Sequence, residues 1–234
     1  LYILVKELNA VLHKAKIEQI YLLENKQLLI QFHVTNAGKQ LFTAKVPDYC
    51  YLMREKPEAP QTPHGYCSFL RKYLKQARLV SIQQLGFERI IDMIFQTKEK
   101  TYHLIMEFIP PGNIMLCDDA MNILSPLENQ QWKDRTIKSH TPYTYPKKVY
   151  NFLTLTEHEL GELLQTTDKE NIVKVLAIDL GFGGEYAEYL CNLAKINKAA
   201  KKLTKQEIQQ LYNAIQALRD HHLAPLVTTE REIF

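Results

Sequence analysis

Residues 79–109 have the sequence LVSIQQLGFERIIDMIFQTKEKTYHLIMEFI. Three runs within it, at 79–85, 89–95 and 102–109, have the length and the apolar pattern of β-strands. The sequence Pro110-Pro111-Gly112 breaks the third run, because neither proline can donate a backbone hydrogen bond to a neighbouring strand. This stretch therefore predicts a β-sheet of at least three strands.

The residues before this stretch change between helical and strand periodicity. The turn Glu24-Asn25-Lys26 separates two strand-like runs, which indicates a hairpin. A helix closer to the sheet carries Arg71 and Lys72 opposite its apolar face, with no acidic residue between them. In order, the sequence predicts a helix over 1–14, strands over 17–23, 28–34 and 41–46, an exposed loop over 55–63 and a helix over 64–77.

The residues after the stretch end in helical periodicity. A short hairpin over 113–117 and 121–124 precedes a segment rich in Pro and Tyr, which predicts a linker. The pairs Thr156/Glu159 and Thr204/Glu207 are capping-box signatures of two helices. A further helix is expected to begin at Thr167 or Asp168 and to reach residue 180. The expected domains are an α+β domain over 1–125, a linker over 126–154 and a helical domain over 155–222.

Composition excludes several classes of protein. The chain has 234 residues, of which 46% are hydrophobic and 24% charged, and its net charge is +3. These values belong to a globular chain and not to a disordered or collagen-like one, and no apolar run reaches the length of a membrane span. The four cysteines are widely scattered, which favours buried thiols in a reducing compartment, and hence the cytoplasm, over a zinc site. The mild positive charge permits a nucleic-acid partner without requiring one.

Sequence motifs of enzymes are missing. The chain contains no GxSxG, Walker, HExxH or zinc-ligand motif, and its eight histidines are scattered. We therefore expect a protein that is not an enzyme by itself. It should have no catalytic residue, metal site or cofactor, no small-molecule substrate and no membrane partner.

Two features of the helical part suit an RNA backbone. Leu180-Gly181-Phe182-Gly183-Gly184 looks like the turn of a helix–hairpin–helix motif, whose glycines expose backbone N–H groups to a phosphate. The alternative is a tight turn whose glycines allow two helices to pack closely. The second feature is a lysine run without an acidic residue from 189 to 206, which either contacts phosphates or forms a solvated face. Its members are Lys195, Lys198, Lys201, Lys202 and Lys205.

Two further features place charge where a partner could use it. Glu88 and Arg89 begin a strand-like run, so their side chains should point to opposite faces; an ordinary surface pair is the alternative. In the expected linker, aromatic residues alternate with cations, as base stacking and phosphate contacts require, although exposed loops also contain such residues. The linker residues are Trp132, Lys133, Arg135, Lys138, Tyr143, Tyr145, Lys147 and Lys148.

Short segments along the chain form a pattern that is specific in its order and spacing. They are ELN at 7–9, AKIEQIY at 15–21, FLRKYL at 69–74, RLV at 78–80, QLGFERII at 84–91, YHLIME at 102–107, GNIML at 112–116 and the helical residues 180–193. Together they resemble the N-terminal domain of the NFACT family, which includes RqcH proteins and the nuclear export mediator factor. The resemblance covers nearly the whole chain and is closest in kind to archaeal RqcH.

The resemblance implies a fold and a function. The fold would be that of the N-terminal domain of formamidopyrimidine-DNA glycosylases, with antiparallel sheets, followed by a helix–two-turn–helix part. The function would be ribosome-associated quality control. Family members bind tRNA, chiefly alanyl-tRNA in prokaryotes, and large ribosomal subunits obstructed by peptidyl-tRNA, and they promote C-terminal tailing of the stalled chain. Residues 223–234 would begin the connection to the family's coiled coil.

The resemblance also implies roles for individual residues. An Asp-Arg pair of the family engages tRNA, and Glu88 and Arg89 stand at its positions, with an acid that is one methylene longer. Glu107 is a second acidic candidate, and Arg71 and Lys72 complete the expected tRNA-binding set. The expected contacts to RNA backbone are Gly181, Gly183, Gly184, Lys195, Lys198, Lys201 and Lys202.

Two alternatives come from other functional classes. One is a glycosylase or lyase that acts on nucleic acid, but such enzymes of this fold use an N-terminal proline as nucleophile, and this sequence begins Leu1-Tyr2. The other is a fibronectin-binding adhesin at the cell surface, because some bacterial relatives carry that name. No signal peptide is visible, which argues against the adhesin.

Overall fold

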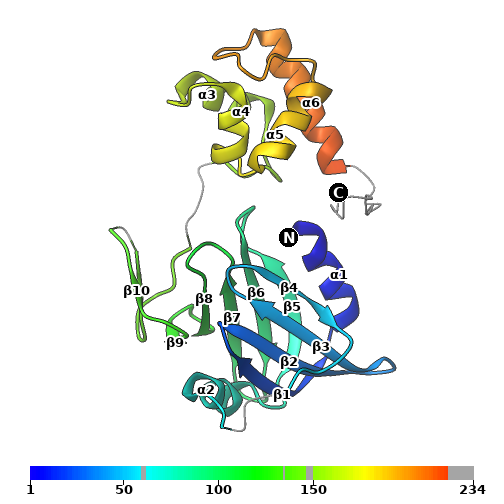
Figure 1. The fold of residues 1–234 in the computed structure, drawn as a ribbon, viewed down its shortest axis with the longest axis vertical. Coiled ribbons are helices and arrows are strands. Elements are labelled where there is room, and N and C mark those ends of the chain that lie inside the picture. Colours follow the sequence, from blue (N-terminus) through cyan, green and yellow to red (C-terminus); the bar gives the residue numbers. More distant parts are fainter. Residues whose placement is uncertain (59–61, 134, 146–149, 221–234) are drawn as a thin grey trace. The chain divides into compact units, whose positions relative to one another are not determined.

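The computed structural model describes residues 1–58, 62–133, 135–145 and 150–220 (Figure 1). The chain divides into two compact units, Leu1–Pro146 and Lys147–Phe234. The boundary between them lies within 126–154, the range in which the sequence predicts a linker. The fold class is α+β, with an antiparallel sheet in the first unit and helices in the second.

The first unit is built on one antiparallel nine-stranded sheet with the strand order β4-β3-β2-β1-β5-β6-β7-β8-β9. The remaining two strands form a small separate sheet. The elements are α1 (Tyr2–Leu12), β1 (Lys16–Leu23), β2 (Gln27–Val34), β3 (Gly38–Lys45), β4 (Tyr49–Met53), α2 (Gly65–Leu74), β5 (Arg78–Gln84), β6 (Ile90–Gln96), β7 (Thr101–Glu107), β8 (Asn113–Asp118), β9 (Ile123–Pro126), β10 (Gln130–Gln131) and β11 (Thr136–Ile137).

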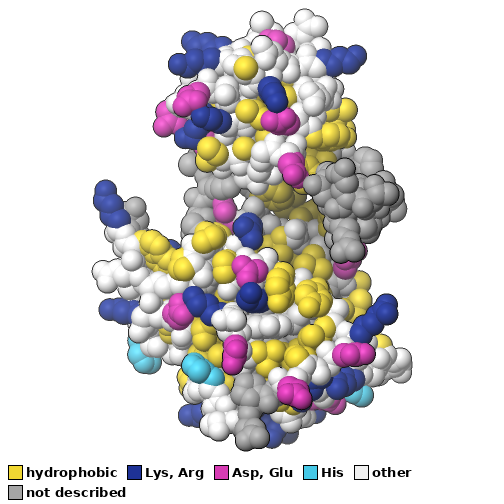
Figure 2. All heavy atoms as spheres, in the orientation of Figure 1, with side chains coloured by type: hydrophobic (Ala, Val, Ile, Leu, Met, Phe, Trp, Pro, Cys, Tyr) yellow, Lys and Arg dark blue, Asp and Glu magenta, His cyan; other side chains and the backbone are white. Residues whose placement is uncertain are grey.

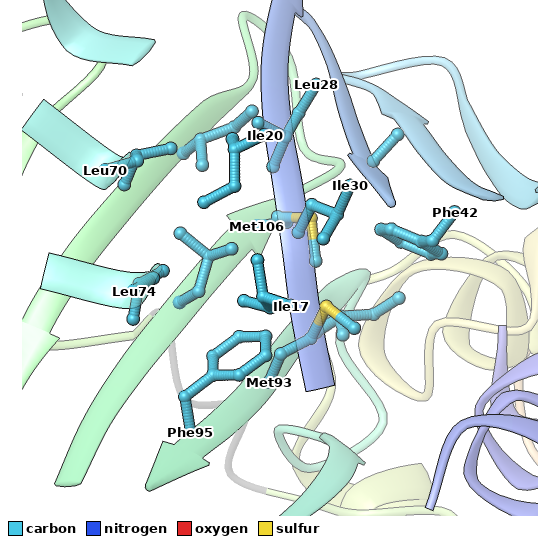
Figure 3. Packing of buried hydrophobic residues seen from close by; sticks show 14 of the residues in the cluster. Ile17, Ile20, Leu28, Ile30, Phe42, Leu70, Leu74, Met93, Phe95 and Met106 are labelled. Atoms are coloured by element: carbon cyan, nitrogen blue, oxygen red, sulfur yellow. The ribbon is translucent and has the colours of Figure 1, made fainter. Parts of the chain in front are cut away.

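The main core lies between the two halves of this sheet. β1 pairs with β5 at one position, Lys16 opposite Arg78, whereas strands within each half pair along their length. Side chains of β1, β2 and β3 therefore pack against those of β6 and β7, as Figure 3 shows. Phe32 and Phe95, both fully buried, stack across the halves with ring centroids 6.3 Å apart. Apolar faces of α1 and α2 complete this core.

A second apolar cluster lies on the other face of β6, β7 and β8. It contains Ile90, Ile105 and Met115, and it is covered by Ile137 and Tyr143, which are 1% and 7% exposed. Part of the range expected to be a linker is thus folded onto the sheet. The sequence signal is weak there, because the strands β10 and β11 have two residues each and the packing residues are spaced irregularly.

Most predicted elements of the first unit are present with small shifts. The first helix ends at Leu12 and not at residue 14, because Lys14 takes a left-handed conformation with φ of 60°. The hairpin of β1 and β2 forms around residues 24–26, and the three decisive runs become β5, β6 and β7. β4 is absent from the prediction, since its sequence YCYLM has too few residues to establish a period.

The second unit is helical in its described part. Its elements are α3 (Glu157–Thr166), α4 (Ile172–Lys174), the π-helical turn η1 (Val175–Asp179), α5 (Gly183–Leu193) and α6 (Lys205–Asp220). Both capping boxes are confirmed: in each, the threonine hydroxyl accepts from the glutamate N–H and the glutamate carboxylate accepts from the threonine N–H. The expected helix that reaches residue 180 is present as the continuous run of α4 and η1 over 172–179, but its predicted start at Thr167 or Asp168 is wrong. Asn171 caps a short α4 instead, by accepting from the N–H of Lys174 at 3.0 Å.

The four cysteines are free and buried. Burial raises the pKa of the Cys50 and Cys117 thiols to about 12, so both stay protonated at neutral pH. Within the described ranges, no helix combines the length and the apolar character that crossing a membrane requires.

Candidate nucleic-acid interface

Four turns of the first unit meet at one end of the sheet. They connect β1 to β2, β3 to β4, β5 to β6 and β7 to β8, and we call this end the rim. The turns are in direct contact: Arg89 reaches the carbonyl of Pro47, and the Phe108 N–H donates to the carbonyl of Arg89 at 2.7 Å. Gly112, with φ of +77°, lies so close to Pro47 that a Cβ there would be 2.8 Å from its nitrogen. The rim is therefore a tightly packed backbone platform.

Glu88 and Arg89 lie on the rim, in the turn between β5 and β6. The prediction that they occupy a strand is wrong. Gly86 takes φ of +62°, the Glu88 N–H donates to Leu85, and the Leu85 N–H donates to Ile90, so a closed turn precedes β6. Their side chains are therefore not held on opposite faces of a strand.

The Arg89 guanidinium is exposed and held in place. Its Nη2 donates to the Pro47 carbonyl at 3.1 Å, and the Arg89 backbone is fixed by the bond from Phe108. A guanidinium has five N–H donors in a planar fork, so one such bond leaves donors that can face a partner. Glu88 is half-buried, and its carbonyl accepts from the Gln84 side chain at 2.7 Å. The geometry therefore orients the Arg89 guanidinium and leaves some of its N–H donors available to a partner.

Glu107 is buried and occupied by other residues of the chain. It is 3% exposed, both carboxylate oxygens accept from Arg135, and Oε1 also accepts from the Tyr143 hydroxyl at 2.8 Å. Burial, reinforced by the charge of Glu107, holds the pKa of the Tyr143 hydroxyl far above its ordinary value. This carboxylate ties the folded segment 135–143 to the end of β7.

The cations and aromatic residues of the expected linker have different roles. The Arg135 guanidinium lies 5.2 Å from the ring centre of buried Tyr143 and 5.7 Å from that of Trp132, so these three residues contact one another. Trp132 is 41% exposed, and Lys133 and Lys138 are exposed as well. Tyr145 packs against the second apolar cluster. Lys147 and Lys148 lie outside the described residues.

Arg71 and Lys72 lie on α2, which packs along β1. The Arg71 Nε donates to the carbonyl of Ile20 at 2.7 Å, and its guanidinium lies over the Tyr21 ring, so it anchors the helix. Lys72 is exposed. The end of α2 approaches Ile17 through a bond from the Gln76 N–H, which places Lys72 toward the end of β1 that is remote from the rim. The structure does not bring these two residues together with Arg89.

In the second unit, the glycine segment leaves the start of α5 open. Gly181 and Gly183 take φ of +76° and +75°, and no side chain caps the first turn of α5. A Cβ on Gly183 or Gly184 would meet nothing within 4 Å. Close packing therefore does not explain these two glycines, although the positive φ explains Gly183.

The lysine run lies at the other end of α5. That helix has 11 residues, which corresponds to a length of about 16 Å at 1.5 Å per residue. Lys195 follows its last turn, and Lys198 pairs with Glu188 at 2.9 Å. Lys201 and Lys202 are exposed. The glycine segment and the lysines could therefore contact different phosphates but not the same one, and Lys198 is partly neutralised.

Among the residues with described positions, no group of three or more His, Cys, Asp or Glu side chains could hold a metal ion. The chemistry that the rim offers is hydrogen bonding and ion pairing. On the face in Figure 2, lysine and arginine side chains alternate with carboxylates over the first unit.

Known proteins match the chain over most of its length. The sequence profile described as NFACT N-terminal and middle domains matches residues 1–232. The archaeal Rqc2 homolog aRqcH of Methanocaldococcus jannaschii is 29% identical, over 88% of this chain and 32% of that protein. The ribosome quality control complex subunit NEMF of Homo sapiens is 30% identical, over 92% of this chain and 20% of that protein. The chain thus spans about a third or less of these relatives.

A solved structure has the same fold. The N-terminal part of the fibronectin/fibrinogen-binding protein from Streptococcus suis aligns with a TM-score of 0.78 and 21% identity. The alignment covers 97% of this chain and 85% of that one. At this identity the likeness establishes the fold alone.

Proposed function

Because the chain belongs to the NFACT family, by its N-terminal and middle domains, we propose that it is the tRNA-binding module of a ribosome quality control factor. In this proposal the complete protein acts in the cytoplasm on large ribosomal subunits obstructed by peptidyl-tRNA. It recruits tRNA, chiefly alanyl-tRNA, for C-terminal tailing of the stalled chain. The module itself catalyses no reaction and needs no cofactor.

The observation that carries this proposal is the exposed, oriented guanidinium of Arg89. Its hydrogen bond to Pro47 and its place between the packed turns of the rim fix the direction of the planar fork. Such a fork can pair with a phosphate or with a base edge through two parallel hydrogen bonds, or stack on an unpaired base. Fixing it before binding reduces the entropy lost on contact with tRNA. Glu88, beside it, is the candidate acceptor for a base amine or a ribose hydroxyl.

The other expected residues have more limited roles in this proposal. Glu107 acts indirectly, by holding the segment 135–143 against the sheet through Arg135. Arg71 acts indirectly too, since its Nε holds α2 to β1, whereas exposed Lys72 can meet a phosphate. In the second unit, the open start of α5 at Gly181, Gly183 and Gly184 and the lysines Lys195, Lys198, Lys201 and Lys202 bind RNA backbone.

The test is tRNA binding by Arg89→Ala and Arg89→Lys, measured by fluorescence anisotropy with a labelled tRNA. Losing a contact made through two hydrogen bonds should weaken binding by about 5- to 150-fold, corresponding to about 1–3 kcal/mol. Lysine should restore little of it, because a point charge lacks the fork. Arg54→Ala is the matched control, since Arg54 is exposed and follows the end of β4 that is remote from the rim. Wild-type affinity in Arg89→Ala, with an unchanged melting temperature, would overturn the proposal for this residue.

A further inference from the structure

A second basic surface lies at the end of the sheet opposite the rim. There, residues 13–17 run antiparallel to residues 76–79, joined by bonds from Lys14 to Leu79 at 3.1 Å and from Leu79 to Ala15 at 2.8 Å. We call this place the β1–β5 junction. It connects the two halves of the sheet, so its backbone is well fixed.

Like charges oppose each other at this junction. Lys16 of β1 and Arg78 of β5 are directly paired across the two strands. On its other side, Arg78 is paired with Gln96 of β6. Directly opposite side chains have Cβ atoms about 4.5–5.5 Å apart, and like charges at that distance repel each other. Lys14 is exposed beside them. A pair of cations in this register is unfavourable for the isolated fold, and an anion between them would relieve the repulsion.

Further cations surround this pair. Lys72 and Lys75 lie in and just after the last turn of α2, and the turn after β6 supplies Lys98 and Lys100; all four are exposed. The local stretches 13–17, 72–78 and 96–101 contain one carboxylate, that of Glu99. The neighbouring Glu18 accepts from Gln31 and lies near His33. In the parts of the chain with described side chains, none of these junction cations forms an ion pair.

The cations border an open groove. It is lined by His13, Lys14, Arg78, Leu79, Val80 and Gln96. Of its apolar members, Leu79 is buried in the core and Val80 is 45% exposed. The surface inside the groove is mostly apolar, so the groove does not by itself identify the partner, and the argument for nucleic acid rests on the cations around it. Several cations without a carboxylate partner, carried on a hydrogen-bonded backbone, are what a surface that contacts nucleic-acid backbone requires.

We propose that the β1–β5 junction is a second RNA-binding surface, which holds backbone phosphates irrespective of base sequence through Lys14, Lys16 and Arg78. This inference rests on the proposed function, because it extends RNA binding by the same unit to a surface remote from Arg89. The rim selects tRNA, and the junction holds the phosphates of another stretch of the bound RNA, tRNA included. Two RNA-binding surfaces at opposite ends of the sheet suit a factor whose RNA partners are longer than one turn of an RNA helix.

The test is binding of a labelled 20-nucleotide RNA by the variant Lys14→Gln/Lys16→Gln/Arg78→Gln at several salt concentrations. Each phosphate contact contributes about 0.7–0.9 to the slope of log affinity against log salt. The variant should therefore lose about two to three units of slope and bind about tenfold or more weakly at low salt. The matched control Lys6→Gln/Lys169→Gln/Lys174→Gln removes three charges from exposed or ion-paired positions elsewhere and should keep the wild-type slope.

Folding and partner class are controlled in the same experiment. The junction variant should melt at or above the wild-type temperature at low salt, because it loses a repulsive pair. If it melts lower, Lys14→Arg/Lys16→Arg, which keeps the charge, must bind the RNA like wild type. The inference is overturned if the folded junction variant keeps the wild-type slope of log RNA affinity against log salt. It is also overturned if the variant loses binding to polyglutamate but keeps its binding to RNA. If the wild-type protein binds neither this RNA nor tRNA, the proposed function fails as well.

Discussion

At the rim, Lys26, Lys45 and Arg135 each lie against a carboxylate, whereas at the β1–β5 junction Lys14, Lys16 and Arg78 have no such partner among the described residues. The same unit thus uses cations in two ways. Paired charges fix the turns of the rim and leave one oriented guanidinium, that of Arg89, for a partner. The unpaired cations of the junction supply an electrostatic field that salt should weaken. If both proposals hold, one end of the sheet provides selectivity for RNA and the opposite end provides most of the electrostatic affinity.

The largest expected effect comes from breaking the buried ion pair of the rim. Glu107→Ala leaves the Arg135 guanidinium half-buried without a counter-charge, which should cost about 3–5 kcal/mol of unfolding free energy. Glu128→Ala breaks the more exposed ion pair between Lys26 and Glu128, and it should cost at most about 1 kcal/mol of unfolding free energy. Urea unfolding of both variants makes the comparison. Equal losses would mean that the Glu107–Arg135 pair does not organise the rim.

Two glycine substitutions should distinguish the cost of a steric clash from the cost of a positive φ. Gly112→Ala combines a positive φ with a clash against Val46 and Pro47, and we expect a loss of about 2–4 kcal/mol. Gly86→Ala requires a similar φ but meets nothing within 4 Å, so about 1–2 kcal/mol is expected. The measurement is again the urea midpoint. A smaller loss for Gly112→Ala than for Gly86→Ala would show that the rim is loosely packed.

A smaller effect is expected from pH. The Nδ1 of His103 lies 2.8 Å from the buried Asp92 carboxylate, and this hydrogen bond raises the pKa of His103 despite partial burial. Because the folded pKa is above the unfolded value of about 6.5, the stabilisation is complete below that pH. It is lost as the pH rises through the folded pKa.

His103→Gln tests this assignment and should flatten the fall in thermal stability as the pH rises from about 6.5 through the folded pKa. Asp118 and Asp119 act in the same direction on His103, so they are left intact in this variant. A wild-type pH profile in His103→Gln would assign the pH dependence to another group.

The sequence predicts the regular elements well and the contacts between distant segments poorly. Helices and hairpins with a clear period are found, because period depends on residues close in sequence. The turn that contains Arg89 is predicted too short: the sequence pattern begins the next strand at Arg89, whereas the turn that starts with Gly86 delays β6 to Ile90. Residue types also cannot show that Arg135 forms an ion pair with Glu107, because the two residues meet only when segment 135–143 packs on the sheet.

The junction illustrates the same limit for the candidate site. Lys16 and Arg78 are unremarkable in sequence, and their significance depends on the register in which β1 meets β5. The glycine segment and the lysine run are neighbours in sequence, yet α5 separates them in space. Sequence therefore supplies the residue types of an RNA-binding surface, and the fold decides which of them act together.

One measurement tests the division of labour most directly: the salt dependence of tRNA affinity for wild type, Arg89→Ala and the triple junction variant. We expect Arg89→Ala to bind tRNA about 5- to 150-fold more weakly, with a salt slope that changes by about one unit or less. The junction variant should lose about two to three units of slope. Equal changes of salt slope in the two variants, or wild-type slope and affinity in both, would contradict this division of labour between the rim and the junction.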